Sequence, residues 1–195
     1  MCRMIDYLIV FKERSQYYQT IDDSASPTTF PILPLNSEYG CIAPRSVLEV
    51  DNGVLALSER GVTWTRPSMV RSQATVDIIS LNVNRDSQVS NGLLGLLNNS
   101  TNAMEAAHAT RFGNKYLLHI GTTTWVLDLE RSSFADGIFC WFPYKGLYQT
   151  AGQFLEVGAY LYLASNAAGL MYRSNSTSYN DDTTAIDAFW TSPLL

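Results

Sequence analysis

The sequence predicts an all-β fold in which about four blade-like repeats follow one another along the chain. Four segments have the same form, an apolar strand, a short polar turn and a second strand: 7–19, 54–65, 116–129 and 160–172. Their turns lie about 47, 61 and 46 residues apart, and a four-stranded propeller blade repeats at about 40–50 residues. Charged residues make up only 16% of the chain, and Ser, Thr, Asn and Gly fill the polar positions. This composition favours strands and turns over long helices.

Glycine and asparagine mark the predicted turns. Asn52-Gly53 lies between apolar segments at 46–50 and 54–57, and this dipeptide is typical of a type I′ hairpin turn. The turn at 58–61 must reverse the chain within four residues, so we expect positive φ at Gly61. We expect the same at Gly169 or a neighbour in the fourth repeat. The apolar strands are expected to be buried on both faces. The residues concerned are Val54, Leu55, Leu57, Leu117, Ile120, Leu161 and Leu163.

The middle interval is about 15 residues too long for one blade, which predicts an insertion near 86–108. Its leucines follow an approximately helical spacing, so we expect one short helix there, although Gly92 and Gly95 weaken the pattern. Prolines within 26–35 predict a long connection rather than a central strand. A last strand is predicted at 185–191.

These boundaries predict a single β-propeller-like domain over residues 1–195, with repeats at about 1–40, 41–85, 109–150 and 151–195. Four blades are the smallest closed propeller, so three arrangements are open: an incomplete ring, part of a longer chain, or sheets that close with partners. Because an open row would leave edge strands unpaired, the sequence favours an oligomer or a truncated chain over a lone open monomer.

Charge, hydropathy and cysteine spacing argue against nucleic acid, membrane and zinc as partners of this chain. The net charge of −5 argues against a basic nucleic-acid module. Arginines 60, 66, 71 and 85 form the most basic stretch, for which a solvated face is the favoured interpretation. The apolar runs are far shorter than the roughly 18 residues of a membrane span, and residues 1–14 do not resemble a signal peptide. Three widely spaced cysteines, Cys2, Cys41 and Cys140, predict free thiols rather than a zinc site or disulfide framework.

No pattern of catalytic or metal-binding residues emerges. His119 lies inside an apolar strand, which favours a structural imidazole, and His108 is eleven positions away. The acidic pairs at 22–23 and 181–182 lack the spacing of a calcium loop. The spacing selects no catalytic pair from the remaining carboxylates considered, Glu49, Asp51, Glu59, Asp128, Glu130 and Asp187. We therefore expect no enzyme activity, no cofactor, and no catalytic or metal residues.

The aromatic residues allow two interpretations. They recur near strand ends and are Trp64, Trp125, Trp141, Trp190, Tyr17, Tyr18, Tyr148, Tyr160, Tyr162 and Tyr172. Packing between neighbouring sheets is favoured, and an exposed carbohydrate- or protein-binding surface is the alternative. We expect the alternate rings of the densest aromatic run, 139–143, to be divided between the two faces of an edge strand.

Several short sequence motifs resemble those of β-propeller structural proteins of tailed bacteriophages, of the packaged-DNA stabilisation and tail accessory type. Residues 41–47 leading into 53–62 resemble one blade entry, and 7–15, 114–129 and 161–172 resemble hairpins of neighbouring blades. The resemblance covers about residues 5–193 and points to the C-terminal part of such a protein.

The resemblance implies a non-enzymatic virion component of the tail or head–tail connector, made in the bacterial host cytoplasm. Its partners would be further copies or other tail and portal proteins, with no membrane and at most transient contact with passing phage DNA. The alternative is a carbohydrate- or receptor-binding adhesin that uses exposed aromatic rings.

Overall fold

The computed structural model describes residues 1–4, 7–20, 31–50, 52–67, 74–84, 92–98, 106–121, 123–144, 151–165, 170–174, 180–181 and 184–185. Most of these residues are in β-strands, and α1 (Gly92–Asn98) is the one α-helix assigned among them. The prediction of an all-β fold with one short helix near 86–108 is confirmed.

Four antiparallel sheets follow one another along the chain, each with its strands in sequence order. The first sheet holds β1 (Cys2–Met4), β2 (Tyr7–Phe11), β3 (Gln16–Thr20) and β4 (Leu33–Asn36). The second holds β5 (Leu48–Val50), β6 (Gly53–Ser58), β7 (Gly61–Pro67) and β8 (Ala74–Ile78). The third holds β9 (His108–Phe112), β10 (Lys115–Ile120), β11 (Thr123–Ser133) and β12 (Ile138–Tyr144). The fourth holds β13 (Ala151–Val157), β14 (Tyr160–Ser165) and β15 (Met171–Arg173), and β16 (Asn180–Asp181) pairs with β17 (Thr184–Ala185).

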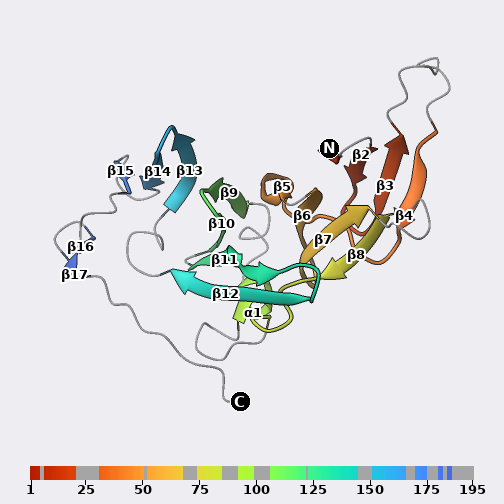
Figure 1. Ribbon diagram of the computed structural model, residues 1–195. Helices are drawn as coiled ribbons and strands as arrows, with labels where there is room; N and C mark the ends of the chain where they lie inside the picture. The colour runs from red at the N-terminus through yellow and green to blue at the C-terminus, as the bar shows by residue number, and fades with distance from the viewer. Residues whose placement is uncertain are drawn as a thin grey trace.

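The four predicted strand pairs form as β2–β3, β6–β7, β10–β11 and β14–β15. The first three are the central pairs of four-stranded sheets, and the fourth lies at one edge of a three-stranded sheet. The first strands of successive sheets contact one another in the order β1, β5, β9, β13 (Figure 1). This is how blades meet around a propeller axis. The row is nevertheless open, because the first and fourth sheets lie at its opposite ends (Figure 1).

One apolar cluster fills each junction between neighbouring sheets. Met4 and Ile9 meet Val54 between the first and second sheets, and Leu117 and Val126 meet Leu161 between the third and fourth. The largest cluster joins the second and third sheets and includes Leu93 of α1. All seven residues predicted to be buried are buried. The expected burial on both faces holds for β6 and β10, whereas Leu161 and Leu163 share the one covered face of β14.

The hairpin from β5 to β6 forms as predicted, but its turn is displaced by one residue. Val50 pairs with Gly53, and Asn52, in the turn between these two residues, has φ +59°. Gly53 already belongs to β6, where a Cβ would overlap the indole of Trp64. The assignment of Asn52-Gly53 as the central pair of a type I′ turn is therefore wrong. Gly53 is explained instead by the close approach of Trp64.

The two other predicted segments, 26–35 and 185–191, are described only in part. The end of the proline-containing connection forms the edge strand β4, which tolerates Pro34 because one side of an edge strand needs no ladder hydrogen bonds. Of the last predicted strand, only Ala185 lies among the described residues, and it ends β17.

The predicted positive φ at Gly61 is confirmed at +119°. Gly169, for which the same was predicted, lies outside the described residues.

Candidate functional site

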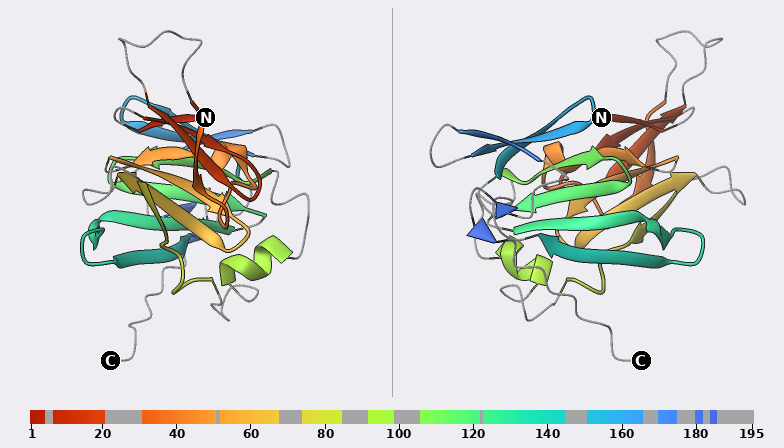
Figure 2. Two further views of the ribbon diagram at one scale, coloured as in Figure 1. Left: turned by 90° about the vertical axis from the view of Figure 1, so that its right-hand side faces the viewer. Right: turned by 60° about the vertical axis from the view of Figure 1, so that its left-hand side comes forward.

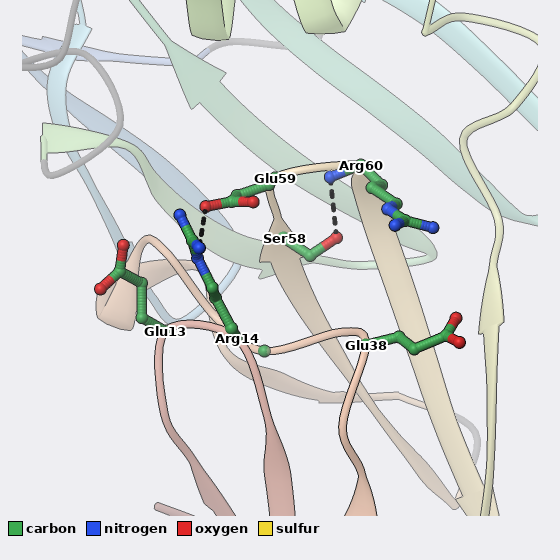
Figure 3. Close-up of a pocket in the computed structure, with 7 residues that line it drawn as sticks. Glu13, Arg14, Glu38, Ser58, Glu59 and Arg60 are labelled. Carbon is green, nitrogen blue, oxygen red and sulfur yellow. Dashed lines mark hydrogen bonds and ion pairs between the residues drawn. The ribbon is translucent and has the colours of Figure 1, made fainter.

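A polar notch lies where the turns of the first and second sheets meet (Figure 3). It is lined by Glu13, Arg14, Glu38, Gly40, Ser58, Glu59 and Arg60. The exposed side chains of Arg14 and Glu59 form an ion pair with 3.2 Å between Nε and Oε1. The free volume of about 10 Å³ is about that of one water position, so the notch is too small for a sugar or a nucleotide.

The carboxylates considered as catalytic candidates are spread over different elements. Glu49 lies in β5, Glu59 in the β6–β7 turn, and Asp128 and Glu130 in β11. Asp128 Oδ1 accepts hydrogen bonds from the amides of Glu130 and Arg131, both at 3.1 Å, which stabilises a break in the β11–β12 pairing. No group of three or more His, Cys, Asp or Glu side chains converges among the residues that the structure describes.

Five acidic candidates, Asp22, Asp23, Asp51, Asp182 and Asp187, lie outside the described residues. A sixth, Asp181, is in β16. The three cysteines are free thiols, as predicted. Cys41 is buried, which raises the pKa of its thiol, and its Sγ lies 3.2 Å from the carbonyl oxygen of Ala43.

The described arginines of the basic stretch contact neighbours within the chain. Arg66 forms an ion pair with Asp77 at 3.3 Å and lies over the Trp64 ring at 4.7 Å. Arg60 lies over the Tyr39 ring at 5.6 Å. These contacts agree with the solvated-face interpretation, while Arg71 and Arg85 lie outside the described residues.

The three described tryptophans pack between the second and third sheets. Trp64, Trp125 and Trp141 all belong to the largest apolar cluster. Trp141 Nε1 donates a hydrogen bond to the carbonyl of Ile79 at 2.9 Å, and its ring meets that of Tyr116 edge-on. The packing interpretation is confirmed for these three, so none of them presents its ring on an open binding surface. Trp190 and Tyr148 lie outside the described residues.

Apolar side chains remain exposed on the back of the fourth sheet, which is its outer face, turned away from the third sheet. Phe154 and Leu161 pack toward the third sheet, so strand alternation turns Leu155 and Tyr160 the other way. Leu155 is 55% exposed and Met171 64% exposed. The remaining members of this outer face are Gln153, Val157, Tyr162, Ala164 and Arg173. Monomeric soluble proteins rarely leave contiguous apolar surface of this kind without a function.

The first sheet has the corresponding open face at the other end of the row, turned to the viewer in the left panel of Figure 2. Ile9 points inward toward Val54, so Leu8 and Val10 point outward. Tyr17 pairs with Val10 on this face, and the ammonium group of Lys12 lies 4.8 Å from the centre of the Tyr17 ring.

Two buried histidines form part of the junction between the third and fourth sheets. His108 and His119 pair across β9 and β10, with their rings 5.2 Å apart, and the ring of Phe154 lies 5.2 Å from that of His108. His119 Nδ1 lies 2.9 Å from Thr124 Oγ1, which confirms a hydrogen-bonded structural imidazole. Burial is the main cause that lowers the pKa of His108, and the nearby Arg45 charge adds to it.

This lowered pKa predicts that acid destabilises the fold. The unfolded chain takes up a proton at His108 near its ordinary pKa of 6.5, whereas the folded chain keeps the ring neutral to lower pH. The free energy of unfolding should therefore fall as the pH drops below about 6.5. Urea unfolding over a pH series should show a shallower loss for His108→Gln than for the unchanged protein. Equal pH slopes for the two proteins would contradict the prediction.

Comparison with known proteins leaves the family open. No model of a protein family matches the chain, and a search of curated proteins finds no similar sequence. The resemblance to phage propeller proteins thus stays a prediction from short motifs. Among the described residues, no helix has the length and apolar character needed to cross a membrane.

Proposed function

We propose that the protein is a non-enzymatic structural component of a phage or prophage virion, in the tail or the head–tail connector, and that it acts through subunit interfaces. The exposed apolar back of the fourth sheet is the observation that supports this proposal most directly. A row of stacked sheets with apolar side chains at its open end is suited to assembly. The motif resemblance supports the choice of a virion as that assembly.

The proposed partners are further copies of the chain or other tail and portal proteins. The protein would be made in the bacterial host cytoplasm and end in the virion. Phage DNA would be at most a transient contact, because the net charge is −5 and the described arginines of the basic stretch are occupied within the chain.

Density-gradient purification of particles from the source organism tests this function. Mass spectrometry should find the chain in the particle fraction at a fixed ratio to portal protein, and the neighbouring genes should encode portal and terminase. Absence from purified particles, or a gene placed in a metabolic operon, would overturn the proposal.

An adhesin is the second candidate, and one observation favours it. Tyr160 is exposed on the back of the fourth sheet, and the Arg173 guanidinium lies 4.7 Å from the centre of its ring. Tyrosine rings, which combine an apolar face with a polar hydroxyl, are enriched at binding surfaces. Glycan binding that is lost in Tyr160→Ala, while the variant stays folded, would support the adhesin. Binding to no glycan or cell surface would count against it.

A further inference from the structure

The two faces of each sheet are named by the order of the sheets along the chain. The front of a sheet is the face toward the preceding sheet, and the back is the face toward the next one. In the third sheet, Tyr116 and Leu118 lie on the front with the second sheet's cluster, and Leu117 lies on the back against Leu161 of the fourth sheet. Every junction in the chain is therefore a back packed on a front.

Two faces are left over at the ends of the row: the back of the fourth sheet and the front of the first sheet. On the back are Leu155, Val157, Tyr160 and Met171, all exposed. On the front are Leu8, Val10 and Tyr17, all half-buried, with Arg3 and Gln19 beside Leu8. Among the described members of the two faces there is no carboxylate, because Glu156 shares the inward side of β13 with Phe154. Each face thus combines apolar side chains with polar or cationic ones, which are Arg3 and Lys12 on the front and Gln153 and Arg173 on the back.

We propose that the back of the fourth sheet packs on the front of the first sheet of a second copy of this chain. This head-to-tail contact rests on the proposed function, and it assigns a second copy of the chain as the partner at the subunit interface. It repeats between two chains the back-on-front junction that the chain already makes three times within itself.

The arrangement of the row favours a second copy over closure within one chain. The two faces lie at opposite ends of the molecule (Figures 1 and 2). A back-on-front contact is heterologous, and a heterologous contact generates a ring when its rotation closes. Two rows of four sheets bring together eight, which is within the range of about 4–8 blades in closed propellers. Such a ring would leave neither face exposed.

The chemistry of the two faces also predicts how the contact responds to salt. Its core would be aliphatic and aromatic side chains, with Lys12 on Tyr17 and Arg173 on Tyr160 as cation–ring pairs within each chain. No ion pair between the two faces is needed. Association should therefore persist at high ionic strength, where contacts between exposed charges are screened.

Sedimentation equilibrium of the full chain and three variants tests the contact. Leu155→Asp places a charge on the back, and Val10→Asp places one on the front. The matched control is Leu81→Asp, because Leu81 is 69% exposed in a turn away from both faces. We expect dimers for the unchanged protein and for the control, in low and high salt, and monomers for each of the other two variants.

Mixing the two monomeric variants is the decisive step. The Leu155→Asp chain keeps an intact front and the Val10→Asp chain keeps an intact back, so an equal mixture should regain dimers through one intact contact. Recovery in the mixture also shows that both variants are folded. Met171→Asp and Tyr17→Asp repeat the test if either first variant fails to fold.

Three results would overturn the head-to-tail contact. The unchanged protein could be monomeric, Val10→Asp could leave the dimers intact, as in a back-to-back contact, or the mixture could stay monomeric although each variant is folded. None of these depends on whether the chain is found in virions. A chain that is in particles but fails this test retains the proposed function and loses only this contact.

Discussion

Replacing Trp141 with alanine is expected to lower the free energy of unfolding by about 3–5 kcal/mol. The indole is 9% exposed and packs among the side chains that join the second and third sheets. Its removal opens a cavity against Tyr116 and leaves the carbonyl of Ile79 without the donor that Nε1 provides at 2.9 Å. Urea or thermal unfolding followed by circular dichroism measures the loss.

Trp141→Phe is the comparison variant, since it keeps a six-membered aromatic ring in the pocket and removes the five-membered ring with its N–H donor. It should cost about 1–3 kcal/mol, clearly less than alanine. Equal stability of Trp141→Ala and the unchanged protein would show that the ring does not hold the two sheets together. Because Trp141 is buried, loss of glycan binding in Trp141→Ala would not identify a binding residue, and Tyr160 is the residue that tests the adhesin.

The strand pairs were predictable because their signal is local. Residues 54–65 and 116–129 are runs of apolar and β-branched side chains joined by short turns, and neighbouring strands pair directly across such turns. The helix at Gly92–Asn98 was predictable for the same reason, since its leucines recur at helical spacing. Burial followed because both faces of these inner strands are covered.

The open faces were not predictable, because the face of a side chain depends on register. The dipeptide Tyr-Leu begins at Tyr116 in β10 and at Tyr160 in β14. Tyr116 is fully buried, whereas Tyr160 is 45% exposed. Leu117 lies on the back of its sheet and Leu161 on the front of the next, so the two dipeptides are offset by one residue. A shift of one residue moves every side chain to the other face, and no local pattern reveals it.

The displaced turn at Asn52 has a similar cause. The Asn-Gly pattern describes the turn alone, but the position of Gly53 is decided by Trp64 on the neighbouring strand. The tryptophans show the same dependence on distant residues. Their strand-end positions allowed both packing and binding, and only the contact between the second and third sheets buries them.

The substitution Gly61→Val is expected to destabilise the fold by more than about 3 kcal/mol, because two separate costs add. The first is backbone strain. Ser58 pairs with Gly61 across the turn, and Gly61 has φ +119°, a conformation that β-branched residues rarely adopt.

The second cost comes from a buried polar network beside the turn. Ser80 Oγ accepts a hydrogen bond from the amide of Val62 at 2.8 Å and donates one to Asn84 Oδ1 at 2.7 Å. Asn84 Nδ2 in turn donates to the carbonyl of Arg60 at 2.9 Å. A Cβ at Gly61 would overlap Ser80 Oγ and lie 2.6 Å from Asn84 Oδ1, so these side chains must move and give up their partners.

Gly113→Val separates the two costs. Gly113 has φ +56° in the β9–β10 turn, and a Cβ there would meet nothing within 4 Å. Valine at this position therefore causes backbone strain alone, about 1–2 kcal/mol. Chemical denaturation of both variants should show the larger loss at Gly61, and Gly61→Val combined with Ser80→Ala should recover part of it by removing the overlapped hydroxyl. If Gly61→Val and Gly113→Val lose the same stability, the network linking Ser80 and Asn84 to the turn contributes nothing to the fold, and the glycine is needed for its φ alone.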